Sequence, residues 1–377
     1  MSTPYADQFP QHKDLCYLNH AAVAPWPRCA RDAVIRFANE NCAEGATHYP
    51  RWLRVEQDLR ENLARLIQAP SADDIALVKN TSEALSFVAG GLAWLAGDEI
   101  IITDQEFPSN RIVWESLRDQ GVIVRVAALN DAATPEDAIE RCLSPRTRLI
   151  AISAVQYGTG LRMDLAKLAA LCKTHNLLFC VDAIQAIGAE PLDVQALGVD
   201  FCMADGHKWM LGPEGLGLFY VKPGLREHLK LMEFGWHMVR HRGDYDRLDW
   251  EPAPDARRFE CGSPNLLGIH ALEASTRLLL EVGLDTVRES LQQHLRHLRH
   301  QLASDPRIHI LTPEAPERHA GILTFRVDGA DHGLLHRRLM EAGVICASRG
   351  GGIRFSPHFY TTPEVIDRAV SILRGLS

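Results

Sequence analysis

Short apolar runs alternate with amphipathic stretches between about residues 75 and 221 of the chain. The apolar runs predict strands at residues 75–80, 99–104, 122–129, 148–155, 177–182, 200–205 and 215–221. Intervening stretches, such as 82–95 and 164–176, carry apolar residues at the helical period. This alternation is typical of an α/β domain built on a mostly parallel sheet. Because ligands gather at the carboxyl ends of the strands in such sheets, we expect the functional residues at that edge.

The pattern changes after residue 221. Residues 235–262 are rich in Gly, Pro, Asp and Arg and show little periodicity. Beyond them the sequence predicts helices at 268–281, 285–303, 332–343 and 362–376, and strands at 321–327 and 343–348. These elements predict a second, smaller α+β domain. We therefore divide the chain into an N-terminal segment, a large α/β domain and a small C-terminal domain, at residues 1–22, 23–262 and 263–377.

Composition and charge exclude several classes of protein. A chain of 377 residues with 46% hydrophobic and 23% charged residues is ordinary for a globular protein of about two domains. The formal charge of −8 argues against nucleic acid or an anionic membrane as the main partner. The sequence has no apolar run long enough to span a membrane and no signal peptide at its polar N-terminus, so we expect a cytoplasmic protein. The nine cysteines form no CxxC pair, which favours free, buried thiols over disulfides.

Candidate chemistry lies at three predicted strand ends. Lys208 follows the strand 200–205 and precedes a glycine-rich turn, although lysine is costly to bury. Asp182 ends the strand 177–182, and Gln185 lies three residues further on. Thr81 and Ser82 stand between a strand and a helix, where free N–H groups and small hydroxyls form an anion site.

Together, these groups suggest pyridoxal 5'-phosphate (PLP). The lysine would form a Schiff base with the cofactor. The aspartate would keep the pyridine nitrogen protonated, which makes the ring an electron sink. The helix start would hold the phosphate.

At this point the sequence resembles a known family. VDAIQ at 181–185 and GHKW at 206–209 are similar to the corresponding motifs of the class V aminotransferases. This group of fold-type I PLP enzymes includes cysteine desulfurases, selenocysteine lyases, kynureninases and isopenicillin N epimerase-like enzymes. The resemblance extends from YLNHAA near residue 17 to IRFSPHFYTTPEVID near residue 353. It implies a homodimer with shared active sites and a small amino-acid substrate.

The resemblance also implies a role for each cofactor residue. Lys208 matches the Schiff-base lysine, and His207 matches a residue beside the phosphate. Asp182 matches the partner of the pyridine nitrogen, and Gln185 the group near the phenolic oxygen. Thr81 matches the phosphate-cradle position, with Ser82 beside it.

Further residues match positions around the substrate and the subunit boundary. Phe107, in EFPSN, falls where the family places a ring stacked on the cofactor. Arg354 resembles the arginine that grips the substrate α-carboxylate, a role that suits the guanidinium fork. Asn19 and His20 resemble the N-terminal segment at the site entrance. Ser263, in CGSPN, resembles the residue that reaches a phosphate in the neighbouring subunit.

Plainer interpretations of these residues stay open. Thr81 and Ser82 are compatible with an ordinary helix cap, and Gln185 with a cap of the following helix. Arg354 fits a structural ion pair and Ser263 a turn. For His294, His297 and His300, we expect a solvated helix face and not a metal site.

Two departures from the family pattern bear on the reaction. Asp205 stands where desulfurases usually carry a serine that touches the phosphate, so we expect its side chain to point elsewhere or to be hydrogen-bonded itself. Desulfurases also carry a nucleophilic cysteine on a loop before the arginine strand. Here that loop is SRGGG at 348–352, without cysteine, and Cys346 lies just before it in an apolar run.

These observations favour a C–S lyase that acts by β-elimination without a persulfide cysteine. An aminotransferase or an isopenicillin N epimerase-like amino-acid epimerase shares the same core residues and remains an alternative. A non-catalytic PLP-fold binding protein is disfavoured by the intact Lys208, Asp182 and Arg354. A Rossmann dehydrogenase is disfavoured because no G-x-G-x-x-G follows the first strand.

Overall fold

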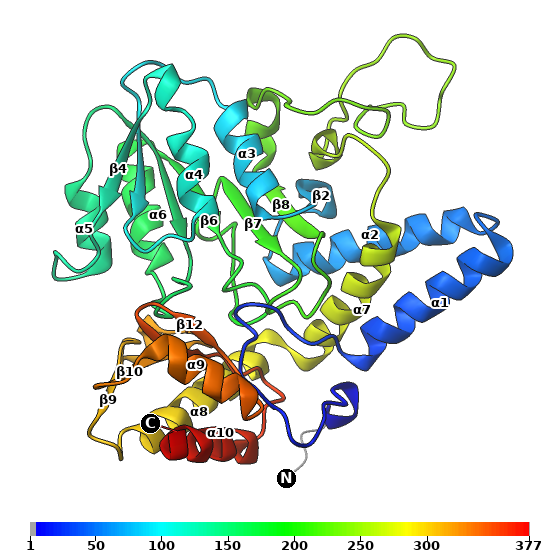
Figure 1. The fold of residues 1–377 in the computed structure, drawn as a ribbon. Coiled ribbons are helices and arrows are strands. Elements are labelled where there is room, and N and C mark those ends of the chain that lie inside the picture. Colours follow the sequence, from blue (N-terminus) through cyan, green and yellow to red (C-terminus); the bar gives the residue numbers. More distant parts are fainter. Residues whose placement is uncertain (1–4, 377) are drawn as a thin grey trace.

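The computed structural model describes residues 5–376, which form a large α/β part and a smaller C-terminal part (Figure 1). The large part is built on a seven-stranded sheet with strand order β2-β8-β7-β6-β5-β3-β4. The strands are β2 (Ile75–Val78), β3 (Glu99–Thr103), β4 (Ile123–Ala127), β5 (Thr147–Ser153), β6 (Leu178–Asp182), β7 (Phe201–Asp205) and β8 (Gly217–Val221). Each lies within or overlaps an apolar run predicted as a strand, so the predicted α/β fold is confirmed.

Most pairings in this sheet are parallel. β3 pairs in parallel with β4 and β5, and β6 pairs in parallel with β5 and β7. β8 is antiparallel to both β7 and β2. The register places Ser153 beside Asp182 and Asp182 beside Met203, so β5, β6 and β7 end at one edge of the sheet.

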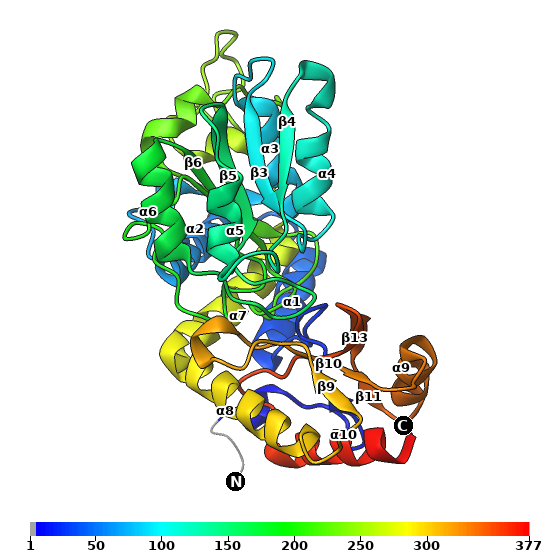
Figure 2. The ribbon, with the colours of Figure 1, turned by 90° about the vertical axis from the view of Figure 1, so that its left-hand side faces the viewer.

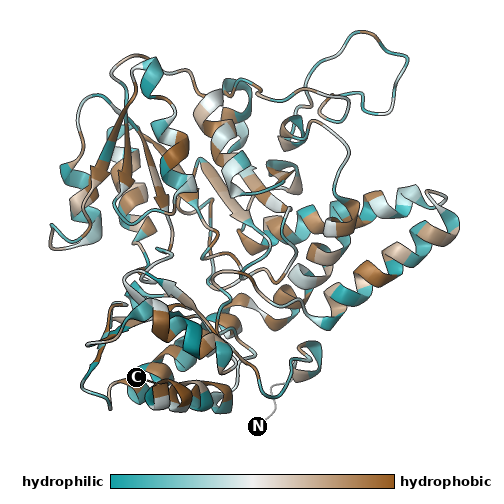
Figure 3. Cartoon of the chain, viewed as in Figure 1, coloured by the Kyte–Doolittle hydropathy of each residue, from teal (hydrophilic) through white to brown (hydrophobic). Residues whose placement is uncertain are grey.

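Helices surround the sheet, whose strands are hydrophobic along most of their length (brown in Figure 3). Those before the C-terminal part are α1 (Arg28–Glu44), α2 (Tyr49–Leu66), α3 (Thr81–Gly91), α4 (Ser109–Glu115), α5 (Pro135–Arg141), α6 (Leu165–His175) and α7 (Leu266–Val282). α3 begins directly after the turn that follows β2, where the Asn80 side chain accepts a hydrogen bond of 2.9 Å from the Glu83 N–H. This cap fixes the N-terminus of α3 at the edge where the parallel strands end.

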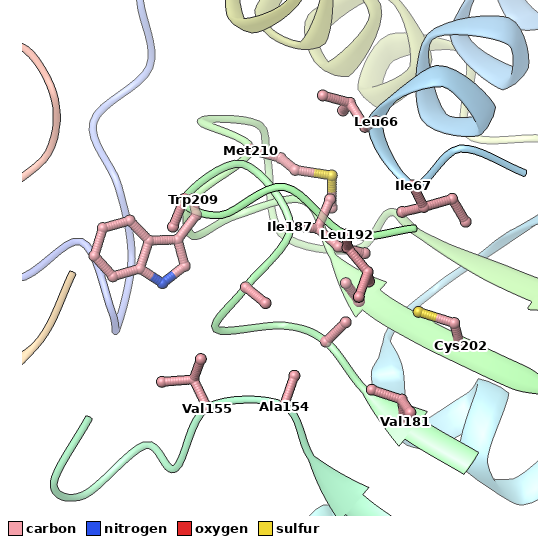
Figure 4. Packing of buried hydrophobic residues seen from close by; sticks show 14 of the residues in the cluster. Leu66, Ile67, Ala154, Val155, Val181, Ile187, Leu192, Cys202, Trp209 and Met210 are labelled. Atoms are coloured by element: carbon pink, nitrogen blue, oxygen red, sulfur yellow. The ribbon is translucent and has the colours of Figure 1, made fainter. Parts of the chain in front are cut away.

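A buried cluster supports the loops after β6 and β7 (Figure 4). Figure 4 labels Leu66, Ile67, Ala154, Val155, Val181, Ile187, Leu192, Cys202, Trp209 and Met210. Gly188 has a φ of +95°, and a Cβ there would lie 2.3 Å from the Trp209 carbonyl oxygen. Only glycine permits this close approach, so the two loops are locked against each other next to Lys208.

The C-terminal part contains a four-stranded antiparallel sheet of order β12-β13-β10-β9 (Figure 2). Its elements are β9 (Ile308–Ile310), β10 (Leu323–Val327), β12 (Ala347–Arg349), β13 (Gly352–Phe355), α8 (Leu284–Leu302), α9 (His332–Glu341) and α10 (Pro363–Leu376). β1 (Cys16–Tyr17) of the N-terminal segment pairs in parallel with β11 (Val344–Ile345). Short 3-10 helices lie at Ala6–Gln8, Ala72–Asp74, Arg118–Gln120, Pro223–His228, Ala256–Phe259 and Pro316–Arg318.

Helix α7 connects the two parts. Ile269 and Leu272 belong to the same buried cluster as Leu59 and Leu63 of α2, so this helix packs on the large part. The division at residue 263 therefore stays a prediction. Between β8 and α7, the chain makes a long excursion that protrudes from the large part (yellow-green in Figure 1).

The expected solvated face of the α8 histidines is wrong for His294 and holds for His300, which is exposed. His294 is buried, whereas His297 is partly exposed and lies 2.7 Å from Asp367. The segment after β13 covers the flank of the helix, and His294 lies close enough to His20 and His358 to lower the pKa of both. Among residues 5–376, no helix is long and apolar enough to cross a membrane, and the cytoplasmic location stays a prediction.

Candidate active site

Lys208 lies at the edge where the parallel strands end. Its side chain is 9% exposed, whereas Lys13, Lys79, Lys167, Lys173, Lys222 and Lys230 are all exposed. Burial lowers the pKa of Lys208 to about 8, while Asp182 and Asp205 raise it and Arg354 lowers it. A lysine with this pKa holds or releases a proton near neutrality, as a general acid–base group must.

Asp182 faces Lys208 from the end of β6. The carboxylate is buried, and its Oδ1 accepts a hydrogen bond of 3.0 Å from the Ile184 N–H. Burial raises its pKa to about 7; the Ile184 N–H and Lys208 lower the pKa, and Glu106 raises it. A buried carboxyl of this kind is stabilised as an anion by a cation placed against it.

The N-terminus of α3 forms the third side of the site. Thr81 is its first residue, and its buried Oγ1 has no hydrogen-bond partner. His207 Nδ1 and Asp205 Oδ1 are also buried without partners, and His207 Nδ1 lies 3.7 Å from Asp205 Oδ2. The Thr81 backbone lies close enough to the Asp205 carboxyl to lower its pKa, so this side chain lies against the start of α3. Buried polar atoms usually have hydrogen-bond partners, so these atoms indicate a bound ligand that supplies the missing ones.

Phe107 covers Lys208. The Lys208 Nζ lies 5.6 Å from the centroid of the Phe107 ring, which is 41% exposed. The Tyr157 ring packs edge-on against Phe107, with centroids 5.1 Å apart. An exposed ring held over the lysine offers a stacking surface for a flat heterocycle.

Arg354 reaches the site from β13. Its Nη1 donates a hydrogen bond of 2.7 Å to the Tyr157 carbonyl oxygen, while its buried Nε has no partner. Burial and Arg349 lower the pKa of Arg354 to about 10. The Oδ1 of Asn19, which lies beside Ser356 in an isolated bridge, is likewise buried and unpartnered. The Arg354 Nε–H can donate to a bound carboxylate, and the Asn19 Oδ1 can accept from a donor such as a substrate amine.

His20 takes a different place from the one predicted. It is fully buried; its Nδ1 lies 2.8 Å from the Ser356 carbonyl oxygen and its Nε2 lies 2.6 Å from the Tyr360 hydroxyl. Both ring nitrogens are engaged in the protein interior, so His20 supports the neighbouring Asn19 and does not contact a substrate. We therefore withdraw the assignment of His20 to substrate binding.

The remaining predicted residues lie around this centre. Gln185 accepts a hydrogen bond of 2.8 Å from Trp209 Nε1 and donates one of 3.0 Å to the Ala21 carbonyl oxygen. Ser82 is exposed, and its hydroxyl donates to Ser109 at 2.8 Å. Ser263 is exposed before α7, and the role of this residue in a neighbouring subunit stays a prediction.

Sequence reasoning missed Glu106 and Tyr157. Glu106 is buried and accepts hydrogen bonds from Thr103, Asn110, Ser153 and Gln156. It lies between the site and β5 and carries the negative charge that raises the pKa of Asp182. Its presence in EFPSN beside Phe107 was the available signal.

The geometry defines a class of protein: an α/β enzyme with a buried lysine and a buried aspartate at the carboxyl edge of its sheet. A sequence profile described as Aminotransferase class-V matches residues 16–368, so the chain belongs to the class V aminotransferase family. It is 30% identical to a probable cysteine desulfurase of Methanothermobacter thermautotrophicus, over 95% of this chain and 93% of that protein. It is 32% identical to the isopenicillin N epimerase of Streptomyces clavuligerus, over 96% and 94% of the two chains.

Solved structures of a protein called C-DES share the fold. A C-DES mutant with glycine covalently linked to the PLP cofactor has a TM-score of 0.91 and 25% identity, with both chains fully covered. The cystine C–S lyase C-DES in complex with its product cysteine persulfide has a TM-score of 0.91 and 24% identity, over 98% and 100% of the chains.

The cofactor is therefore pyridoxal 5'-phosphate, and the site fits it. Lys208 would hold it covalently, and Asp182 would face its ring nitrogen. The unpartnered Thr81 Oγ1 lies at the N-terminus of α3, and the unpartnered His207 Nδ1 lies in the loop after β7; this pair of elements suits the phosphate. Phe107 would stack on the ring.

Proposed function

We propose that this PLP-dependent enzyme is a C–S lyase, which cleaves the Cβ–S bond of a sulfur-containing amino acid by β-elimination. PLP, when bound, supplies an electron sink for negative charge at the substrate Cα. The observation that carries the proposal is that, within residues 5–376, the loop before Arg354 has no cysteine and Cys346 is buried, beside a site of desulfurase-like architecture. The named relatives of this chain include a probable cysteine desulfurase, which makes a sulfur amino acid the first substrate to test.

The segment before Arg354 cannot act as a mobile cysteine loop. β12 and β13 pair from Arg349 to Gly352, so only Gly350 and Gly351 form the turn. Both have positive φ, at 59° and 81°, and a Cβ on Gly350 would lie 2.4 Å from the Gly158 carbonyl oxygen. A tight turn that only glycine tolerates has no room for a cysteine that swings toward a substrate.

Cys346 does not replace that cysteine. It is 2% exposed, and burial raises its pKa to about 12, although Arg354 lowers it. The thiolate is the nucleophile in sulfur transfer, and a buried thiol with a raised pKa is inert near neutral pH.

The other residues supply positioning and proton transfer. Arg354 would hold the substrate α-carboxylate through its free guanidinium edge. The Lys208 amine would then remove the Cα proton, and the electron pair left at Cα would expel sulfur from Cβ. The protonated Lys208 would then return a proton. After hydrolysis, the carbon products are pyruvate and ammonia, and sulfur leaves with the remainder of the substrate.

The experiment is product analysis with cysteine and with cystine as substrates. We expect pyruvate and ammonia in equal amounts, and we expect Cys346→Ser to give the same products at a rate within about twofold of the wild type, since the residue lies outside the chemistry. Alanine from the wild type that disappears in Cys346→Ser would contradict the proposal and establish a desulfurase. Cys42→Ser, at an exposed site on α1, is the matched control.

An amino-acid epimerase is the second candidate, because the isopenicillin N epimerase resembles the chain over almost its full length. Exchange of the Cα proton with solvent and inversion of configuration, without loss of sulfur, would favour it. Formation of a keto acid with transfer of the amino group would instead favour an aminotransferase.

We further propose that the enzyme is a homodimer with shared active sites. Ser263 is exposed near Lys79 and Glu233, at a position that the family uses to contact the neighbouring subunit's phosphate. Sedimentation of the holoenzyme at assay concentration is expected to give twice the mass of the chain. A fully active monomer with bound cofactor would refute the shared site.

A further inference from the structure

Asp205 is an acidic group in a site that has to bind an anion. It ends β7, and its side chain lies against the first residue of α3, where the Thr81 backbone stabilises it. Its Oδ1, the Thr81 Oγ1 and the His207 Nδ1 are three buried polar atoms without partners, contributed by a strand end, a helix start and a loop. Such atoms are rare in folded proteins, and together they indicate a polyoxygen ligand between them.

The charges around Asp205 do not neutralise an ionised carboxylate next to a phosphate. Lys208 lies near it, but Lys208 is also the group that binds the cofactor covalently. Asp182 on β6 and Glu214 in the loop before β8 are both acidic and raise the pKa of Asp205. Burial lowers the pKa of His207 to about 4, so its imidazole is neutral near pH 7. The start of α3 contributes the Thr81 hydroxyl and the partial positive charge of the helix N-terminus.

Protonation of Asp205 removes the repulsion between its carboxylate and the phosphate. Burial is the largest cause that raises the pKa of Asp205, to about 7, although Lys208 and the Thr81 backbone lower it. A carboxylic acid has an O–H donor, and it can make the bond to a phosphate oxygen that a serine hydroxyl would make. An approaching phosphate would raise the pKa of the carboxyl further, because like charges disfavour ionisation.

We propose that Asp205 binds the phosphate of PLP as a carboxylic acid, and that cofactor binding takes up one proton at this residue. The proton comes from solvent when Asp205 is ionised in the free protein. It then lies on Asp205 Oδ1 or on the phosphate oxygen, so the two groups together carry one negative charge less than they would carry separately. The proposal rests on the cofactor and is independent of the reaction that the enzyme catalyses.

The affinity for the phosphate should fall as the pH rises. Below about pH 7, Asp205 is already protonated and the phosphate binds without proton uptake. Above that pH, each unit is expected to weaken phosphate binding by about tenfold, because one proton must be acquired. A serine or asparagine at this position donates a hydrogen bond at every pH and is not expected to show this dependence.

The test measures affinity and not activity. The full chain, freed of PLP, is titrated with pyridoxine 5'-phosphate, which has no aldehyde and cannot react with Lys208, between pH 6 and pH 9. Binding is followed by tryptophan fluorescence in the wild type, Asp205→Asn, Asp205→Ser and Glu214→Gln. The last variant removes a nearby exposed acidic charge outside the phosphate contacts. Because Glu214 raises the pKa of Asp205, this variant should keep the wild-type pH dependence and move its midpoint to lower pH.

We expect the affinity of the wild type, relative to that of Asp205→Ser, to fall about tenfold per pH unit above pH 7. Asp205→Asn should follow Asp205→Ser, and Glu214→Gln should show the same slope as the wild type with its midpoint at lower pH. Titration of the ligand phosphate is common to all four proteins and cancels in the ratio. Pyridoxine without phosphate should show no difference among them.

Parallel pH profiles for wild type and Asp205→Ser would overturn the proposal, as would loss of affinity in Asp205→Asn at every pH. Calorimetry at pH 8 in buffers of different ionisation enthalpy gives a second measurement. It should show about one more proton taken up per site by the wild type than by Asp205→Ser. Equal uptake would also overturn the proposal, even if Asp205→Asn failed to fold.

Discussion

Replacement of Lys208 by alanine is expected to lower turnover by at least about a thousandfold, because the side chain has two roles in the proposed reaction. It binds the cofactor covalently, and it moves the proton at the substrate Cα, a role that alone contributes about 10²–10⁴-fold. The variant should still bind PLP noncovalently, since Asp182, Thr81 and Phe107 are unchanged. Rates with cysteine and cystine, measured at saturating PLP, test the expectation.

Borohydride reduction identifies the attachment site independently of activity. In the wild type it should fix one pyridoxyl phosphate group on Lys208, which blocks tryptic cleavage there and leaves a peptide spanning residues 174–226, because Pro223 prevents cleavage after Lys222. Lys222→Ala is the control, because Lys222 is exposed and pairs with Asp200 at 3.0 Å. Label on a peptide without Lys208, or normal turnover of Lys208→Ala, would refute the assignment.

The strand ends that carry the chemistry could be predicted from the sequence for a physical reason. Strands β6 and β7 are buried on both faces, and such strands appear as continuous apolar runs. Each run ends in an acid, Asp182 or Asp205, where the chain leaves the sheet. Parallel pairing of the two strands is then enough to predict that Asp182 and the segment before Lys208 lie at the same edge of the sheet.

Contacts between distant segments could not be predicted in this way. Nothing in the periodicity around Asp205 shows that its carboxyl meets the start of α3, because that contact depends on how β2 and β7 are placed by β8 between them. The bond from Arg354 to the Tyr157 carbonyl oxygen likewise joins the two parts of the molecule through a backbone atom that every residue type carries.

The N-terminal motif shows a different limit. Resemblance placed both Asn19 and His20 at the site entrance, but neighbouring residues of an extended segment point to opposite sides. The segment pairs with β11 and then with Ser356, which turns His20 into the interior. Only the three-dimensional pairing decides which of the two side chains faces the ligand.

Asp182→Asn is expected to keep the fold and the cofactor but to lower turnover by at least about a hundredfold, the scale of losing one preorganised electrostatic partner. Asn has nearly the same shape as Asp, and its Oδ1 can still accept the hydrogen bond from the Ile184 N–H. The neutral amide cannot hold the pyridine nitrogen in its protonated form, because a nearby negative charge is what favours that cation. The loss should therefore appear in kcat more than in the affinity for substrate.

The matched control is Asp200→Asn, at the opposite end of the same strands. Asp200 is also buried and accepts a hydrogen bond of 3.0 Å from the Phe179 N–H, but it pairs with Lys222 and lies outside the site. It should lower the melting temperature and leave kcat nearly unchanged. The absorbance spectrum of bound PLP gives a readout besides activity, since loss of the ring proton alters it in Asp182→Asn and not in Asp200→Asn. Near-normal kcat with an unchanged spectrum in Asp182→Asn would show that another group holds the ring nitrogen.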